Sequence, residues 1–181
     1  MKKNFKILLI VLIFILIDQG IKIYISNNLM GKEFYILDNT LTFKPLINTK
    51  YSYYNSFFDL GIGLLPHIIM NILTILILLI VMDFIKKRYG YSKLACYLFV
   101  FLLAGAVCSL IDKVAWGGSL DYIKLQGFFT FDLKDIYIAI FEIIAILAII
   151  LNWKNLKKVN EKVVYNEFKT YINTKYFNKH V

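Results

Sequence analysis

The chain has 181 residues, of which 59% are hydrophobic, and its mean hydropathy is +0.64. These values lie outside the range of soluble globular proteins and exclude a large soluble domain, so we expect one membrane-embedded unit. The formal net charge of +9 raises the question of nucleic-acid binding, but the lysines cluster beside apolar runs, where such side chains usually face anionic headgroups. We therefore expect membrane lipids as partners, and no nucleic acid.

Four apolar stretches are long enough to cross a bilayer, which takes about 20 helical residues. They cover residues 5–26, 60–82, 94–111 and 136–153, and only Glu142 interrupts the last of them. Each is predicted to be a helix, because backbone polar groups in lipid must pair within their own segment. The lysine-flanked first stretch also resembles a secretory signal peptide, but no small-residue cleavage site follows it, so we predict an uncleaved span.

The charges of the connecting segments predict the orientation. The amino terminus, segment 83–93 and the tail after residue 153 carry an excess of basic residues, whereas segments 27–59 and 112–135 do not. The positive-inside rule then places both termini in the cytoplasm and these two segments on the extracytoplasmic side. The basic tail, residues 154–181, is predicted to form an amphipathic stretch on the inner leaflet, separate from a four-helix unit over residues 1–153.

The two outer segments are too polar to span the membrane. Residues 33–37 and 41–43 contain β-forming side chains, and Asp38 with Asn39 makes a turn between them, so a small sheet on the outer leaflet is predicted. Tyrosines and phenylalanines over residues 51–58 are typical of an interfacial aromatic belt. The glycine-rich segment 116–129 is expected to act as a lid over a site, or simply to re-enter the interface. The predicted fold class is an all-α membrane protein with four transmembrane helices and this β-like outer region.

Two aspartates mark the outer ends of the third and fourth spans. Asp112 follows the third apolar stretch and Asp135 precedes the fourth, so both are expected at one level of the membrane. A carboxylate at a membrane boundary is costly and indicates a functional site. Two carboxyl groups at short range cannot both ionise, and such a pair can activate water against an amide bond. The sequence therefore predicts an intramembrane aspartyl protease without a covalent intermediate, a metal or a cofactor.

A second charged pair lies in the outer half of the first span. Asp18 and Lys22 are four residues apart and can neutralise each other on one helix face. The pair either sets the depth of the helix or supports the aspartates, and the sequence leaves both interpretations open.

The chain resembles the lipoprotein signal peptidases (signal peptidase II). The resemblance runs through Asp-Gln-Gly-Ile-Lys at 18–22, Ala-Gly-Ala-Val-Cys-Ser-Leu-Ile-Asp-Lys at 104–113, the segment 117–121, and Phe-Asp-Leu-Lys-Asp at 131–135. In order and topology it extends to about residue 151. It implies that Asp112 and Asp135 are the catalytic aspartates and that Asp18 and Lys22 support them. It also implies that Asn48 is the asparagine of the outer loop.

Three departures from the family pattern affect the expected site. Cys108 and Ser109 replace a Gly-Asn pair, Lys113 replaces an arginine, and Asp132 replaces an asparagine. Ser109, Lys113, Asp121 and Asp132 are therefore treated as supporting or substrate-binding positions. Asp132 is predicted to cap the fourth helix while facing water, and Lys113 and Lys134 are predicted to snorkel outward.

The resemblance implies that the substrates are diacylglyceryl-modified prolipoproteins, cut on the amino side of the lipidated cysteine. The implied location is the bacterial cytoplasmic membrane, with the site on the extracytoplasmic side, and a monomer is expected. Two other functions stay open at this point. The first is a related protein that binds lipoproteins or lipid without cutting. The second is a small ion-coupled membrane protein using Asp18, Asp135 and Glu142 as a relay.

Overall fold

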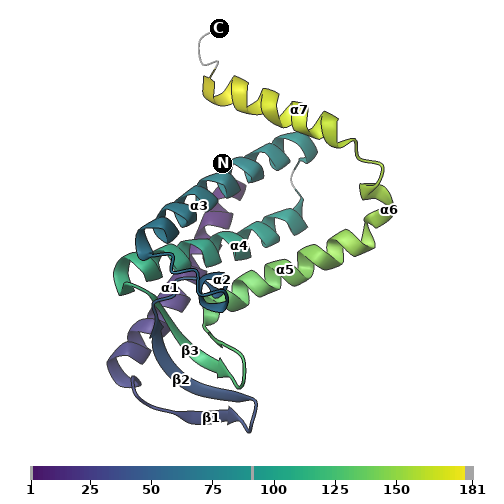
Figure 1. Ribbon diagram of the computed structural model, residues 1–181. Coiled ribbons are helices and arrows are strands. Elements are labelled where there is room, and N and C mark those ends of the chain that lie inside the picture. The colour runs from purple at the N-terminus through teal and green to yellow at the C-terminus, as the bar shows by residue number, and fades with distance from the viewer. Residues whose placement is uncertain (1, 91, 178–181) are drawn as a thin grey trace.

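The computed structural model describes residues 2–90 and 92–177, and long helices make up most of it (Figure 1). These helices are α1 (Lys2–Asn28), α3 (Leu64–Tyr89), α4 (Lys93–Ile111) and α5 (Leu133–Leu151). Each coincides with one of the four predicted apolar stretches to within a few residues at most of their ends. The second stretch is displaced, because α3 continues beyond Asp83 through the basic residues to Tyr89.

Three helices in the described part of the chain are long and apolar enough to cross a membrane. They are Phe5–Asn28, Leu64–Tyr89 and Lys93–Trp116. Helix α5 has 19 residues, and Lys134, Asp135 and Glu142 all lie within it. The protein is thus a membrane protein with three candidate spans, and the fourth span and the orientation remain predictions.

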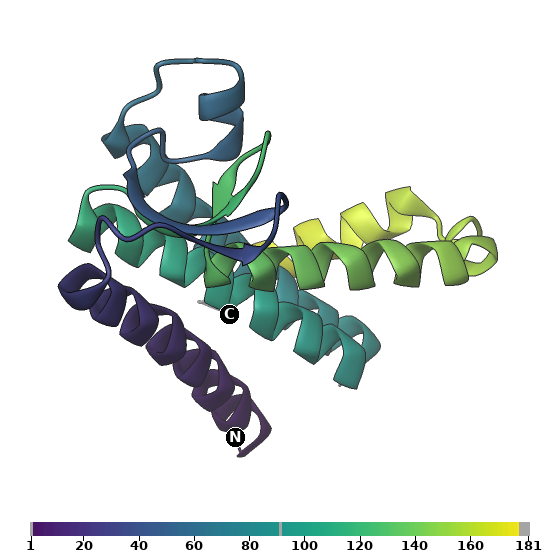
Figure 2. The same cartoon turned by 90° about the horizontal axis from the view of Figure 1, so that it is seen from below.

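A four-stranded antiparallel sheet lies beside one end of the helices. Its strands are β1 (Phe34–Leu37), β2 (Leu41–Asn48), β3 (Ser119–Leu125) and β4 (Thr130–Phe131), in the order β1-β2-β3-β4. The predicted hairpin and its turn are present, and Asn39 adopts the left-handed conformation (φ 58°) that asparagine tolerates in turns. Seen from below, the sheet lies over the place where α5 begins (Figure 2).

Strand β3 is the main feature of the fold that the sequence did not predict. Segment 112–135 was expected to be a loop, but β3 pairs with β2, with Leu46 opposite Asp121 and Asn48 opposite Ser119. Helix α4 also continues as a π-helical turn, Asp112–Trp116, before the chain reverses at Gly117. Segment 119–125 forms a strand because the backbone N–H and C=O groups on one edge of β2 need hydrogen-bond partners. Residues far away in the sequence supply them.

Gly118 lets β2 and β3 approach each other beside the site. A Cβ atom at this position would lie 2.8 Å from the carbonyl oxygen of Asn48 and 2.9 Å from the Ile47 side chain. Because a backbone oxygen cannot move away cheaply, Gly118→Ala is expected to push β3 off β2 and to lower the midpoint of thermal unfolding in detergent. Gly20→Ala is the matched control, since a Cβ there meets open space. Equal unfolding midpoints for the two variants would contradict this strand contact.

Two apolar clusters hold the helices and the sheet together. Buried side chains of α1, α4 and α5, such as Val11, Leu103 and Tyr137, form the first cluster. Ile25 and Leu120 belong to the second, which joins the end of α1 to the sheet. The two clusters fix the relative positions of α1, α4, β3 and the start of α5, and these are the elements that carry the polar residues described below.

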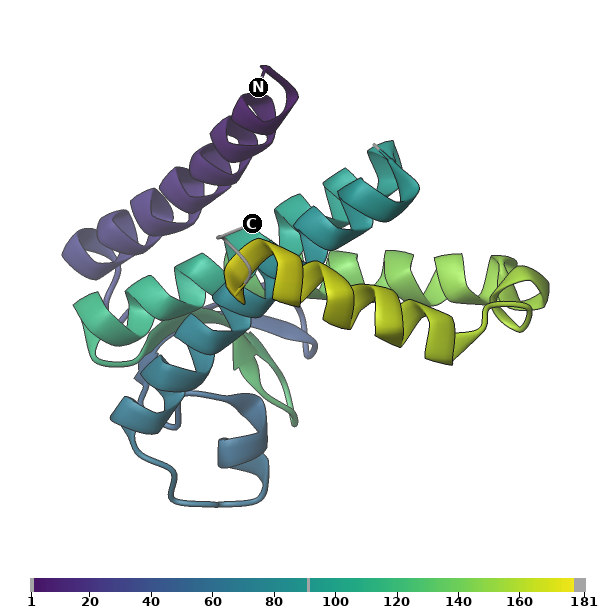
Figure 3. The ribbon, with the colours of Figure 1, turned by 90° about the horizontal axis from the view of Figure 1, so that it is seen from above.

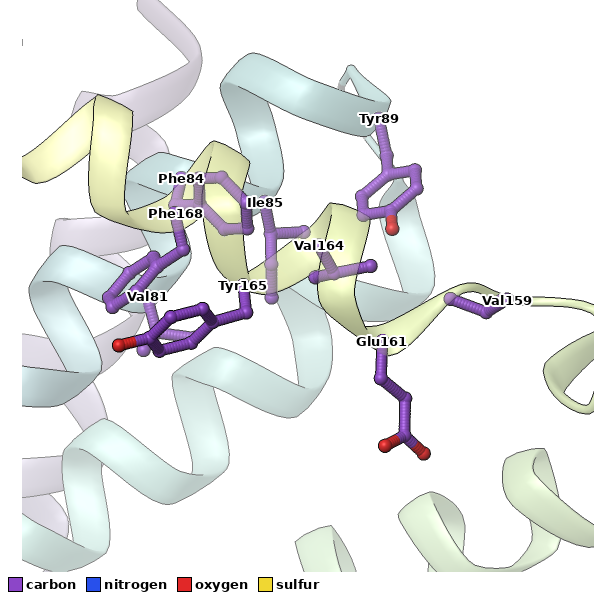
Figure 4. Close-up of a pocket in the computed structure, with 9 residues that line it drawn as sticks. All are labelled: Val81, Phe84, Ile85, Tyr89, Val159, Glu161, Val164, Tyr165 and Phe168. Carbon is purple, nitrogen blue, oxygen red and sulfur yellow. The ribbon is translucent and has the colours of Figure 1, made fainter.

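The tail returns to pack on α3. After α6 (Trp153–Leu156), helix α7 (Glu161–Ile172) crosses α3 and is followed by a π turn, Asn173–Phe177 (Figure 3). Tyr171 donates a hydrogen bond to Asp83 (2.6 Å), and the rings of Phe84 and Phe168 lie 5.1 Å apart. Beside this contact is an open apolar groove of about 510 Å³ (Figure 4). A tail helix is therefore present, and its place on the inner leaflet remains a prediction.

A short helix, α2 (Tyr53–Phe57), stands in the outer aromatic segment. The side chain of Ser52 caps it, and the Tyr53 ring meets Phe129 of the β3–β4 turn at 5.6 Å. Most rings of this segment are exposed, Tyr54 and Phe57 by 70% and 66%. The contact joins the two outer segments.

Candidate active site

Lys22 of α1 lies at the centre of a buried ion network. Its ammonium is 2.9 Å from Asp18, 2.7 Å from Asp112 and 2.7 Å from Asp132, and all four side chains are fully buried. One cation thereby joins α1, the end of α4 and the start of α5. This geometry favours one of the two interpretations of the Asp18–Lys22 pair: the pair supports the other aspartates. It is not a surface ion pair that only sets the depth of the helix.

Asp112 is held on both of its carboxylate oxygens. Lys22 donates to the two oxygens at 2.8 and 2.7 Å, and the Gln19 amide donates to one of them at 3.1 Å. The Ser119 hydroxyl oxygen lies 3.2 Å from the other oxygen. Gln19 is itself fixed by the indole N–H of Trp116, at 3.1 Å. Asp112 therefore has charge neutralisation and hydrogen bonds, but no exposed surface.

Strand β3 brings a second aspartate to the same place. Ser119 and Asp121 are two residues apart, so they lie on one face of the strand, and Ser119 Oγ donates to Asp121 at 2.6 Å. The Asn48 amide donates to the other oxygen of Asp121 at 2.9 Å. Burial raises the pKa of Asp121 above its ordinary value, against the opposing effect of the Lys134 ammonium. The predicted outer-loop asparagine thus contacts an aspartate of the site.

The first turn of α5 supplies the remaining carboxylates. Asp132 is the N-cap residue: its side chain accepts from the backbone N–H of Asp135 at 3.2 Å, while the Asp135 side chain accepts from the backbone N–H of Asp132 at 3.1 Å. Such reciprocal capping satisfies helix-terminal donors, and carboxylates are favoured there. The predicted cap is confirmed, but its exposure to water is wrong, because Asp132 is fully buried against Lys22.

Lys134 lies among these carboxylates, and its predicted outward snorkelling is wrong. Its ammonium is 2.7 Å from Asp132, 3.4 Å from Asp112, and 3.6 Å from both Asp121 and Asp135. The side chain is 7% exposed. Several carboxylates within contact distance stabilise an ammonium inside, so it does not extend to the interface. Burial alone would raise the pKa of Asp132, but Lys134 and Lys22 outweigh it and lower that pKa.

Carboxylate oxygens of Asp121, Asp132 and Asp135 lie within 4.8 Å of one another. This spacing is short enough for a divalent cation, yet the Lys134 ammonium contacts each of the three already. Within this group, Asp135 has the accessible side chain, 41% exposed, compared with 4% for Asp121 and 0% for Asp132. The cluster therefore opens toward solvent at Asp135.

Ser109 and Lys113 lie next to this cluster and pair with each other. The Lys113 ammonium donates to Ser109 Oγ at 2.8 Å and to its carbonyl oxygen at 3.4 Å. Both belong to the end of α4 and its π-helical continuation, and Lys113 is buried. Its predicted outward snorkelling is therefore also wrong, because the polar atoms one turn earlier on the same helix give the ammonium an internal partner.

Two residues of the network were missed at the level of sequence. Gln19 contacts Asp18 and Asp112, and the Ser119 hydroxyl lies within 3.4 Å of three aspartates. For Ser119 the available signal was its position two residues before Asp121, which places the pair on one face if the segment is a strand. For Gln19 the available signal was its place directly after Asp18, inside the Asp-Gln-Gly-Ile-Lys run of α1.

The family model for signal peptidase (SPase) II matches residues 10–151. This range contains every aspartate and lysine of the network described above. The chain belongs to the signal peptidase II family. The matched range ends with α5, so α7 lies beyond the part of the chain that the family model describes.

Comparison with individual proteins agrees with this membership. The lipoprotein signal peptidase of Bartonella henselae is 28% identical over an alignment of 165 residues, and the match covers 84% of this chain and 93% of that protein. A bacterial membrane enzyme solved in meso at 2.3 Å superposes with a TM-score of 0.70 at 22% identity, covering 86% of this chain and 93% of the other. A second bacterial membrane enzyme, solved in meso at 1.9 Å, superposes with a TM-score of 0.62 at 23% identity, covering 80% of this chain and 92% of the other. The structural matches share the fold, and the family and the relative support cleavage of lipoprotein signal peptides.

Proposed function

We propose that the chain is an intramembrane aspartyl endopeptidase that removes signal peptides from diacylglyceryl-modified prolipoproteins. Family membership supports the substrate class. A cluster of aspartates at the ends of apolar helices, closed on one side and accessible at Asp135, supports the catalytic chemistry. The single observation that carries the proposal is the approach of the Asp121 and Asp135 carboxylates within 4.8 Å.

We assign the water-activating pair to Asp121 and Asp135. The sequence pointed to Asp112 and Asp135, but both oxygens of Asp112 are engaged by Lys22 and its side chain is fully buried. A carboxylate that holds a lysine with both oxygens is poorly suited to exchange a proton with water. Asp121 has its charge partly offset by Ser119 and Asn48, and it faces the accessible Asp135. In this assignment Asp112 is a positioning residue.

The proposed reaction is general acid–base hydrolysis of an amide. One carboxylate of the pair takes a proton from water, the water oxygen attacks the scissile carbonyl, and the other, protonated carboxyl donates to the developing oxyanion. The carboxyl that took the proton from water then delivers it to the leaving nitrogen as the C–N bond breaks, and the other carboxylate recovers its proton from a hydroxyl of the tetrahedral intermediate. The two groups titrate as a unit, so neither is assigned to one role.

The proposal also covers how the chain crosses the membrane. The basic segments favour four spans over residues 1–153 with both termini in the cytoplasm of a bacterial cell, and a monomer whose site faces the outer side. The sheet and the site then lie at the outer surface, with the exposed Tyr54 and Phe57 in the headgroup region, where aromatic rings are favoured. A cysteine introduced at Asn39 is expected to react with a membrane-impermeant maleimide in whole cells, and one at Asn160 only after lysis.

The non-catalytic and ion-coupled alternatives draw less support from the geometry. A relay would need Glu142 to face Asp135 or Asp18, but the Glu142 side chain is exposed on α5 and Asp18 is sealed by Lys22. A binding protein without turnover would not need an accessible carboxylate, Asp135, next to a second one, Asp121.

The decisive experiment uses the purified protein in detergent with a diacylglyceryl-modified precursor, followed by gel shift. Cleavage of the lipidated precursor, with the unmodified precursor left intact, is the expected result. Stable binding of the lipidated precursor without any cleavage over a pH series would overturn the peptidase assignment in favour of a binding protein.

A further inference from the structure

Asp132 and Lys134 are two charged residues that enter the site together. They are two positions apart at the start of α5, and the Lys134 ammonium lies 2.7 Å from Asp132. Asp132 is fully buried, and the Lys134 side chain is 7% exposed. A buried carboxylate or ammonium without a partner is strongly destabilising. Asp132 is the carboxylate closest to Lys134, and Lys134 shares the charge of Asp132 with Lys22.

The ammonium also reaches beyond this pair. Lys134 donates to Ser119 Oγ at 2.6 Å, and Ser119 in turn donates to Asp121 at 2.6 Å. It lies 3.6 Å from both Asp121 and Asp135, the two residues assigned to water activation. Lys134 thus sits where a positive charge acts on both carboxylates at once.

We propose that Asp132 and Lys134 act as one charge-compensated unit that positions the catalytic carboxylates, with Lys134 as the positioning residue. The inference rests on the proposed function. Lys134 adds a positive charge beside Asp121 and Asp135, and Asp132 adds a negative one. Together they therefore contribute no net charge to the site. The ammonium holds Ser119 and, through it, Asp121, while Asp132 keeps the ammonium in place and caps α5.

Other charged groups face Lys134 from the elements packed around it. They are Asp18, which accepts from the backbone N–H of Lys134 at 3.1 Å, and Lys22 of α1, Asp112 and Lys113 of the π-helical turn, Asp121 of β3, and Asp135 of α5. None of these groups is substituted in the variants below. Differences between these variants therefore report on the Asp132–Lys134 unit.

The test is a double-mutant cycle with Lys134→Met, Asp132→Asn and the two combined. Methionine keeps the length of the lysine stem, and asparagine keeps the capping oxygen. Removal of a positive charge in contact with carboxylates favours their protonated forms, so Lys134→Met is expected to move both limbs of the pH–activity profile to higher pH, by about one pH unit or more. Its kcat near neutral pH is expected to fall about tenfold or more.

The combined variant is expected to recover at least half of that loss on a logarithmic scale and to return the pH profile toward that of the wild type. Lys44→Met is the matched control, because it removes one lysine from an exposed ion pair with Glu33 on the sheet. It is expected to leave the profile unchanged.

The proposal is overturned if Lys134→Met keeps the wild-type activity and pH profile, or if the combined variant is no better than Lys134→Met. Should Lys134→Met fail to fold, the yield and thermal midpoint of the combined variant take the place of kcat: recovery supports the unit, and no recovery overturns it. If the wild type cleaves nothing, the proposed function fails, and the same cycle measured on thermal midpoints still decides whether the two residues are coupled.

Discussion

Asp121→Asn and Asp135→Asn are each expected to reduce cleavage of a lipidated precursor by about 100- to 10,000-fold, the usual contribution of a general acid or base. Asparagine keeps the shape of the side chain but can neither take a proton from water nor deliver one. The Asp121→Asn side chain keeps an oxygen that can accept a hydrogen bond from Ser119, and the side chain of Asp135 is 41% exposed. Both variants are therefore expected to remain folded. The measurement is single-turnover cleavage in detergent, with thermal unfolding as the check on folding.

Glu142→Gln provides the matched control for Asp135→Asn. Glu142 lies on the same helix, seven residues later, and its side chain is exposed. The variant makes the same chemical change away from the cluster and is expected to cleave like the wild type. A loss as large as that of Asp135→Asn would show that the carboxyl matters and would revive the ion-coupled alternative.

Asp112→Asn separates the two assignments of the catalytic pair. Lys22 contacts both oxygens of Asp112, so the variant weakens a buried ion network and is expected to lower the thermal midpoint. Because Asp112 is not the proton carrier in our assignment, the folded fraction should keep measurable activity. A variant of wild-type stability with no activity at all would instead support Asp112 and Asp135 as the pair.

The helices of this protein could be predicted from the sequence because lipid imposes a local rule. An apolar run of sufficient length must form a helix, and residues 5–26 and 94–111 follow that rule without help from the rest of the chain. The β1–β2 hairpin also depends on local sequence, since Asn39 at its turn is a residue type that tolerates the left-handed conformation. These features depend on neighbours a few residues away.

The site could be predicted only in part, because its contacts join distant segments. The aspartates were found by their position at the ends of apolar runs, but the identity of their partners was not. Asp121 was assigned a supporting role because the pairing of β3 with β2, which turns it toward Asp135, is not a local signal. Lys134 was expected at the interface for the same reason. Its attraction to four aspartates depends on a fold that brings together β3, the π-helical turn after α4 and the start of α5.

Lys22 is expected to be the residue on which the fold of the site depends most. Lys22→Met keeps the length and apolar stem of the side chain but removes the ammonium that contacts Asp18, Asp112 and Asp132, all fully buried. Breaking a buried ion pair by removing one partner costs about 3–5 kcal/mol, and three carboxylates are affected here. Their mutual repulsion would then separate α1 from the ends of α4 and α5.

We therefore expect Lys22→Met to show a large drop in thermal midpoint in detergent and loss of cleavage, with Lys44→Met, whose lysine is exposed, unfolding like the wild type. Lowering the pH should partly restore the stability of Lys22→Met, because protonation of the three carboxylates removes the negative charges that have lost their cation. A variant that melts like the wild type at neutral pH would show that the three carboxylates are neutralised in another way, for example by protonation or by Lys134. The network would then be organised around α5 and not around α1.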